Sequence, residues 1–248
     1  MLSPAAIEEW GWRVPFLLGL LVGAIGFLVR RGLLREAPPA ARGFPLADLL
    51  RGQKRALLQG VGLCLVNAVG FYMIFIYFVT WLRVAIHLPL AHALDINTAT
   101  MVVALAVIPT AGRLADRFGR RPLLLVGACG LLLLTLPLLT LMQSGGIAAI
   151  LAGELGFVLL IGCYTAVNPT AVAELYPRAV RCSGVSLAYN LAFGVIGGLT
   201  PMIATWLVAR TGDPLSPAFY LVGAAALSLA AALCLGQRAF RLLDAETA

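Results

Sequence analysis

The stretch Gly112-Arg-Leu-Ala-Asp-Arg-Phe-Gly-Arg-Arg-Pro122 decides the fold class of this 248-residue chain, because four arginines and one aspartate interrupt an almost unbroken apolar sequence. The flanking segments, 99–111 and 123–142, are too apolar for helices of a soluble protein. Arginines between membrane spans are retained on the cytoplasmic side of a bilayer. The pattern therefore predicts a short cytoplasmic loop between two membrane helices.

The composition favours a membrane protein and excludes a soluble globular one. Hydrophobic residues make up 61% of the chain and charged residues 12%, and the mean hydropathy is +0.95. So little polar surface cannot cover a soluble globule, whereas a lipid bilayer needs no such cover. The formal net charge of +7 comes from basic residues scattered between apolar segments, not from one continuous tract, so we expect no nucleic-acid partner.

Seven segments are long enough to cross a membrane as helices, which takes about 20 apolar residues. Because lipid offers no partner to an unpaired backbone group, each segment must close its own hydrogen bonds as an α-helix. We therefore expect an all-α, polytopic membrane protein with a lipid bilayer around it. The predicted spans are 12–29, 56–82, 93–111, 123–142, 147–172, 185–208 and 217–235.

The basic residues predict how these spans are oriented. If the first span ends inside the cell, only Arg13, Arg83 and Arg210 of the 18 lysines and arginines lie outside. The positive-inside rule then places the N-terminus outside and the C-terminus in the cytoplasm. This distribution is typical of a multi-pass protein of a bacterial-type inner (plasma) membrane.

Polar intervals divide the predicted spans into parts. The longest interval is rich in proline, is expected to be a cytoplasmic linker, and contains a short amphipathic helix near residues 44–50. Spans 123–142 and 217–235 carry few polar groups and should be peripheral, whereas 56–82, 147–172 and 185–208 should face a cavity or one another. The expected parts are one helix in residues 1–30, a linker in 31–55, a six-helix bundle in 56–236 and a cytoplasmic tail in 237–248.

Four passages of the chain, taken in their order and spacing, resemble those of a known protein family. They are Trp10-Gly-Trp-Arg-Val-Pro-Phe-Leu-Leu18, Leu88-Pro-Leu-Ala-His-Ala-Leu-Asp-Ile-Asn-Thr98, the stretch from Gly112 to Pro122, and Glu174-Leu-Tyr-Pro-Arg-Ala-Val-Arg-Cys-Ser-Gly184 with Tyr189-Asn190 and Gly197-Gly-Leu-Thr-Pro201 after it. In these passages the chain resembles the C-terminal half of a major facilitator superfamily transporter. The branch it resembles is that of the metabolite:proton symporters, which includes proline/betaine, citrate, shikimate and α-ketoglutarate carriers. The resemblance implies helices six to twelve, with helices one to five absent from these residues.

Two charged motifs are candidates for a gate. The glycines of the first motif would allow close helix approach and a tight turn, its aspartate could accept hydrogen bonds from the arginines or cap a neighbouring helix, and its arginines could bind acidic groups or lipid phosphates. In the second motif Glu174 and Arg181 could meet each other, bind the charges of the first motif, or form a surface ion pair worth about 0 to 1 kcal/mol. The resemblance implies a latch that stabilises the outward-facing state. The candidate gating residues are Gly112, Asp116, Arg117, Gly119, Arg120, Arg121, Glu174 and Arg181.

A second set of polar residues lies inside the apolar spans and could line a path for solute or protons. Glu154 shares one helix face with Tyr164 and Asn168, within about 80°. It is either a proton acceptor on that path or a side chain that snorkels to the outer interface. Asn67, with aromatic residues near it, either binds a zwitterionic or cationic solute or bonds to another helix. The candidate path residues are Asn67, Tyr77, Glu154, Tyr164 and Asn168.

These observations favour a secondary active transporter of a small organic solute, an organic acid, amino acid or betaine, coupled to protons by alternating access. The alternative is a truncated, non-transporting membrane fragment, or a half-transporter that needs a separate N-terminal half. The sequence contains no nucleophile with a base, no metal-ligand cluster and no nucleotide-binding loop, and its five cysteines form no CxxC pair. We therefore expect no enzymatic activity, no cofactor and no metal.

Overall fold

The computed structural model describes residues 4–33, 45–177 and 179–235, in which every regular element is a helix. The chain divides into two units, Met1–Arg42 and Gly43–Ala248. The first unit contains α1 (Pro4–Glu9), the 3₁₀ turn η1 (Gly11–Arg13) and α2 (Val14–Leu33). Its segment Gly11–Val29 is apolar and long enough to cross a membrane. The predicted tail 237–248 and much of the predicted linker lie outside the described residues.

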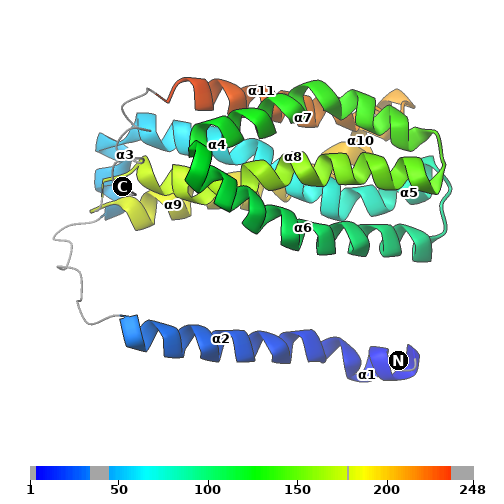
Figure 1. Ribbon diagram of the computed structural model, residues 1–248, viewed down its shortest axis with the longest axis horizontal. Coiled ribbons are helices and arrows are strands. Elements are labelled where there is room, and N and C mark those ends of the chain that lie inside the picture. Colours follow the sequence, from blue (N-terminus) through cyan, green and yellow to red (C-terminus); the bar gives the residue numbers. More distant parts are fainter. Residues whose placement is uncertain (1–3, 34–44, 178, 236–248) are drawn as a thin grey trace. The chain divides into compact units, whose positions relative to one another are not determined.

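The second unit is a helical bundle (Figure 1). Two π-helical stretches, η2 and η3, each join two α-helices into one long span, Lys54–Ala85 and Arg181–Thr211. The predicted helix near residues 44–50 is confirmed as α3. The elements of the bundle are α3 (Pro45–Gly52), α4 (Lys54–Tyr72), η2 (Met73–Tyr77), α5 (Phe78–Ala85), α6 (Leu90–Phe118), α7 (Arg120–Gln143), α8 (Ile147–Glu174), α9 (Arg181–Tyr189), η3 (Asn190–Gly197), α10 (Thr200–Thr211) and α11 (Pro217–Leu233).

The predicted spans correspond to helices in both units. Six helical segments of the described residues are long and apolar enough to cross a membrane. The seventh predicted span is α11, whose 17 residues stand at the lower end of the usual range of about 17–25. The all-α, polytopic membrane class is therefore confirmed.

The prediction of a loop from Gly112 to Pro122 is wrong in its extent. Helix α6 continues to Phe118 and α7 begins at Arg120, so that Gly119 alone separates the two helices. Arginine and aspartate are compatible with a helix, and Pro122 lies in the first turn of α7, where proline costs no backbone hydrogen bond. The break comes from Gly119, whose φ of 89° is open to glycine and strained for other residues.

Helix α8 lies in the middle of the bundle, between α6 and α7 in Figure 1, and it also packs against α4. The approach of α7 is close because Gly127 lies against the backbone of α8. A Cβ added at Gly127 would lie 2.9 Å from the carbonyl oxygen of Leu160. Small residues at such contacts let membrane helices pack without a hydrophobic driving force.

Helices α7 and α11 do not face lipid on every side, although their few polar groups would allow it. Helix α7 packs against α8 and α11, and α11 packs against both α7 and α4. In the most apolar stretch of each span, 39% of residues are buried for α7, against 28% for α6 and 22% for the span Arg181–Thr211. Helix α7 is therefore more buried than α6 and the α9–α10 span, which have broad open faces.

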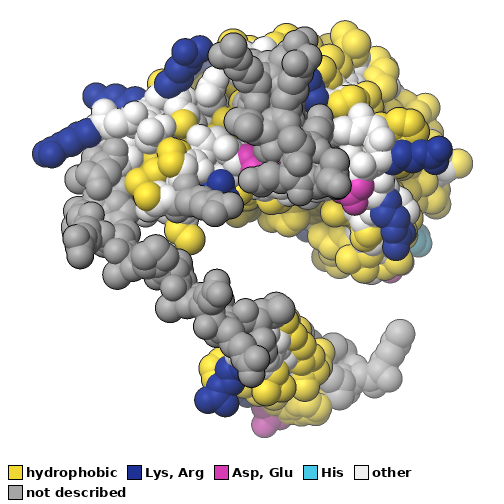
Figure 2. Space-filling model, turned by 60° about the vertical axis from the view of Figure 1, so that its left-hand side comes forward, with side chains coloured by type: hydrophobic (Ala, Val, Ile, Leu, Met, Phe, Trp, Pro, Cys, Tyr) yellow, Lys and Arg dark blue, Asp and Glu magenta, His cyan; other side chains and the backbone are white. Residues whose placement is uncertain are grey.

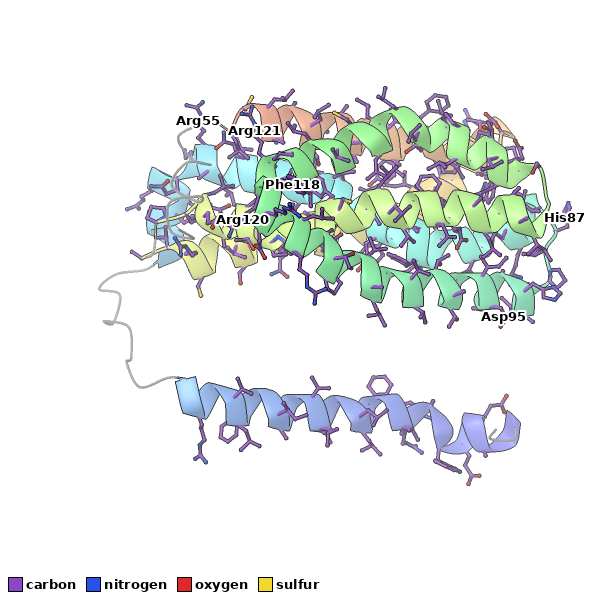
Figure 3. The ribbon with its side chains drawn as sticks, in the orientation of Figure 1. Arg55, His87, Asp95, Phe118, Arg120 and Arg121 are labelled. Atoms are coloured by element: carbon purple, nitrogen blue, oxygen red, sulfur yellow. The ribbon has the colours of Figure 1, made fainter. Side chains whose placement is uncertain are left out.

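Charged residues gather at the two ends of the bundle. Figure 3 shows Arg55, Arg120 and Arg121 at one end, and His87 and Asp95 at the other. Figure 2 turns the first end forward and shows Lys and Arg side chains over it, while hydrophobic side chains cover much of the sides. Arg178 lies outside the described residues. We call the end with Arg120 the basic end, and the end with His87 the opposite end.

Candidate functional site

A polar network centred on Asn168 joins three helices inside the bundle. Asn168 is fully buried and donates from Nδ2 to the carbonyl oxygen of Leu63, at 2.9 Å. Its Oδ1 accepts from Nδ2 of Asn67 at 3.3 Å and from the hydroxyl of Tyr189 at 3.0 Å. The hydroxyl of Thr165 donates to Oδ1 of Asn67, at 2.6 Å. Both polar atoms of each asparagine side chain therefore have partners, as buried amides require.

The same network reaches the backbone of α4. The hydroxyl of Tyr164 also donates to the carbonyl oxygen of Leu63, at 2.8 Å. On the α11 side, the hydroxyl of Ser228 accepts from the N–H of Val66 at 2.9 Å and donates to the carbonyl oxygen of Gly62 at 2.6 Å. In a regular helix these two backbone groups bond to each other. Helices α8 and α11 are thus both anchored on one turn of α4.

Three of the five candidate path residues, Asn67, Tyr164 and Asn168, come together in this network. The bonds of Asn67 go to α8, which is the helix-packing arrangement considered for it. Tyr77 is not part of the network: it lies buried in η2, ten residues or about 15 Å of helix beyond Asn67, and its hydroxyl bonds to no described residue. Sequence reasoning missed Thr165, although its spacing from Asn168 puts both on neighbouring positions of one helix face.

A groove of about 310 Å³ opens beside this network, between α4–η2, α6 and α8. The rings of Phe71 and Phe75 lie 5.4 Å apart between centroids and form one wall. Thr165 brings a hydroxyl to the lining and links the groove to Asn67. No arginine or lysine of the described residues lines the groove. The lining residues are Phe71, Phe75, Met101, Ala104, Leu105, Ile108, Val158, Ile161, Gly162 and Thr165.

Glu154 occupies a different site, between α8 and α6. Its side chain is fully buried, so the snorkelling interpretation is wrong for this structure. The hydroxyl of Thr100 donates to Oε2 of Glu154 at 3.1 Å and lies 2.9 Å from the carbonyl oxygen of Asn97. Oε1 of Glu154 and Oδ1 of Asn97 are buried without a hydrogen-bond partner in the described part of the chain. Fourteen residues, about 21 Å of helix, separate Glu154 from Asn168.

The candidate gating residues meet at the basic end through one ion pair. Nη1 of Arg120 lies 2.5 Å from Oε1 of Glu174, and both side chains are about four-fifths buried, with exposed fractions of 19% and 23%. Arg120 is the first residue of α7 and Glu174 the last of α8. Each charge therefore has the same sign as the helix dipole end at which it stands, which is unfavourable by itself. Pairing them offsets both repulsions.

Asp116, Arg117 and Arg181 are not joined to this pair. Nε of Arg181 donates to the carbonyl oxygen of Tyr176 at 3.2 Å, not to Glu174. Asp116 is exposed and has no hydrogen bond or ion pair with a described residue, and the guanidinium of Arg117 lies over the ring of its neighbour Phe118 at 5.4 Å. A Cβ at Gly112 would meet no atom within 4 Å, so the close helix approach expected there is absent from the described bundle.

Sequence reasoning also missed Tyr176, which clamps two helices at the basic end. Its buried ring lies between Gly60 of α4 and Gly184 of α9: a Cβ at Gly184 would lie 2.5 Å from Cδ1 of the ring, and one at Gly60 would overlap the phenol oxygen. Burial raises the pKa of Tyr176 to about 12. The hydroxyl has no hydrogen-bond partner among the described residues. Two glycines so far apart in sequence give no local signal of a shared contact.

Within the described residues, no three His, Cys, Asp or Glu side chains come together as a metal site would require. Comparison with known proteins instead relates the chain to transporters. Residues 41–243 match the family model described as "Sugar (and other) transporter".

Individual relatives match along nearly the whole chain. Proline/betaine transporters are 32% identical over 100% of it in Escherichia coli K12 and 31% over 96% in Salmonella typhimurium. A citrate-proton symporter of Klebsiella pneumoniae is 32% identical over 96%. These matches cover 51% to 55% of the relatives, so the chain spans about half the length of the curated relatives it matches. The chain belongs to the sugar (and other) transporter family of the major facilitator superfamily, and it corresponds to the C-terminal half.

Proposed function

We propose that this chain supplies the C-terminal half of a secondary active transporter, which moves a small organic solute together with protons by alternating access. The observation that carries the proposal is the open groove between α4–η2, α6 and α8, whose wall continues into the Asn168 network. Transporters of this kind bind solute near the middle of the membrane, at the junction of two halves. Half a binding cavity would be an open groove of this type.

The chemistry of the groove favours a zwitterion with a positively charged nitrogen. The rings of Phe71 and Phe75 would attract an ammonium group through cation–π contacts. The hydroxyl of Thr165 donates its proton to Asn67, which leaves its lone pairs to accept a hydrogen bond from a donor on the solute. Because the described lining of the groove contains no basic residue, these residues do not balance the charges of a citrate-like anion. Among the relatives, the proline/betaine transporters therefore suggest the solute class.

The basic end would act as the cytoplasmic latch, with the N-terminus outside. Arg120 and Glu174 tie α7 to α8, while Asp116 and Arg117 remain exposed and could engage an opposing bundle. The open face at Gly112 would admit a helix of that bundle closely. In this proposal residues 1–30 end the N-terminal half, 31–55 are the linker, and Arg121 and Arg181 add positive charge that holds this end in the cytoplasm.

A second candidate is that the chain is a membrane fragment without transport activity. The relatives are about twice as long, and the groove has no wall on its open side within the described residues. The two candidates differ in whether the chain supports uptake when an N-terminal half is also present.

Uptake of labelled glycine betaine, proline and citrate would test the proposal in cells that lack their own carriers. The chain would be produced alone and together with the N-terminal half of the Escherichia coli proline/betaine transporter. We expect the paired halves to accumulate betaine or proline, with loss on adding a protonophore. Phe71→Leu should reduce uptake, and the matched control Phe219→Leu, in a second apolar groove, should not.

Three results would decide between the candidates. Uptake only with the second half would confirm that the chain supplies the C-terminal half of a transporter. Uptake by the chain alone would exclude the fragment and show that no separate N-terminal half is needed. No uptake of any of the solutes, with both halves present in the membrane, would overturn the transporter proposal and leave the fragment.

A further inference from the structure

The buried Glu154 site contains more hydrogen-bond acceptors than donors. The two carboxyl oxygens of Glu154 are acceptors, and the hydroxyl of Thr100 is the donor among the described residues that reaches them. On α6, three residues before Thr100, Oδ1 of Asn97 is also buried without a donor. That hydroxyl has one proton and already lies within bonding distance of the carbonyl oxygen of Asn97. At least two buried acceptors are therefore left without a donor.

Such a shortage is costly in this environment. A charged carboxylate costs up to about 2.5–3.5 kcal/mol in a membrane helix, the value at the helix centre, and Glu154 is the eighth of the 28 residues of α8. A buried acceptor without a donor costs about 1–3 kcal/mol. No arginine, lysine or histidine offsets the charge, because the ion pair found in the described chain is the one between Arg120 and Glu174, at the other end of α8. A proton bound to Glu154 would remove the charge and supply a donor at once.

The titratable groups around the site do not replace that proton. Helix α7 presents Met142 and Leu138 to this part of α8, and Phe78 packs on Phe157 one turn below Glu154. The titratable or charged groups of the elements packed against this half of α8 are His92 and Asp95 on α6, which are exposed, Tyr77 on η2, which is buried, and Arg83 on α5, which is exposed. None of them forms a hydrogen bond or ion pair with Glu154.

We propose that Glu154, Thr100 and Asn97 form a cation site whose occupant is a proton, and that this site is distinct from the solute groove. That this proton takes part in transport rests on the proposed function. That the site binds a proton rests on the contacts between α6 and α8. Met101 follows Thr100 on α6, and Val158 lies one turn after Glu154 on α8, and both line the groove. The proton site and the solute groove therefore share α6 and α8. A change in the spacing of these two helices at one site would alter the other site.

Labelling with a hydrophobic carbodiimide tests the site without any transport. The reagent adds to a carboxyl group that is protonated and lies in an apolar environment. The 248-residue chain would be placed in liposomes, labelled over a range of pH, and digested for mass spectrometry. We expect labelling at Glu154, falling as pH rises, and little labelling of the exposed Asp95 or Asp116.

Two variants of α6 sharpen the test. Thr100→Val removes the donor that stabilises the ionised carboxylate, so labelling of Glu154 should persist to higher pH, with a proton affinity about tenfold higher. Thr98→Val is the matched control, because the hydroxyl of Thr98 is exposed and bonds to the carbonyl oxygen of Leu94 on its own helix. It should leave the pH profile unchanged.

Several outcomes would overturn the proposal. Glu154 that resists the reagent at every pH, in chain that remains monodisperse, is not a protonated buried carboxyl group. Protection by sodium, compared with choline at the same pH, would make the occupant a metal cation. Failure of solute uptake with an intact labelling profile would count against the proposed function and leave the cation site standing, so the two failures are distinguishable.

Discussion

The Asn168 network and the Glu154 site lie on the same helix, α8, and are satisfied in opposite ways. Every side-chain polar atom of Asn67 and Asn168 has a partner, and the bonds tie α4, α8 and α9 together. Around Glu154, two buried acceptors have none among the described residues. A fully bonded network stabilises one arrangement, whereas a site short of donors is completed by a ligand that brings one. The comparison separates residues that hold the bundle from residues that bind.

The largest expected effect comes from removing the centre of the bonded network. Asn168→Leu leaves Nδ2 of Asn67 and the hydroxyl of Tyr189 without their acceptor, and should lower the free energy of unfolding by about 2–4 kcal/mol. Thermal unfolding of the detergent-solubilised chain would measure it. Asn190→Leu is the control, since Asn190 is exposed and donates to Ser186 of its own helix. Equal stability of the two variants would contradict the structural role.

Replacing the carboxyl group of Glu154 should have the opposite sign. Glu154→Gln keeps the shape and adds a donor without a charge, so it should stabilise the chain by about 1–2 kcal/mol at alkaline pH, where the carboxyl group of the parent has lost its proton. The same change at Glu174→Gln breaks an ion pair and should destabilise it. Thermal unfolding of both variants is the measurement. A destabilised Glu154→Gln would place Glu154 with the structural residues and remove the contrast.

The sequence predicted the membrane class from composition, the span positions from the length of the apolar segments, and the buried face of α8 from helical periodicity. Asn67, Tyr164 and Asn168 could be chosen from that periodicity, since polar residues in apolar spans must find partners. It could not show that Glu154 is buried under α6, because its two alternatives depend on a neighbouring helix. Tyr176 was missed for the same reason: its clamp needs Gly60 and Gly184, which meet only in the folded bundle.

Exchanging the two charges of the ion pair at the basic end should have a smaller effect on stability, and the sign of that effect tests the helix-dipole argument. Exchanging the charges, Arg120→Glu with Glu174→Arg, keeps the pair and gives each helix end the charge that its dipole favours, worth about 0.3–1 kcal/mol at each end. The double variant should therefore be at least as stable as the parent, and each single variant less stable. A double variant as unstable as the singles would show that the pair is not coupled in solution.

The smallest expected effect is that of replacing Tyr176. Its hydroxyl, like Oε1 of Glu154, has no partner among the described residues, so the variant tests whether every such polar atom marks a ligand site. Tyr176→Phe keeps the ring between Gly60 and Gly184 and removes an orphaned hydroxyl, so at neutral pH stability should stay equal or rise by up to about 1 kcal/mol. The pH dependence has a definite sign. With a pKa of about 12 in the fold and about 10 when unfolded, the phenol's contribution is fully present below pH 10 and is lost as pH rises toward 12. The advantage of Tyr176→Phe should therefore grow across that interval in thermal unfolding. A loss of stability at neutral pH would show that the hydroxyl has a partner. The lack of a partner for Oε1 of Glu154 would then no longer distinguish the Glu154 site from the Asn168 network.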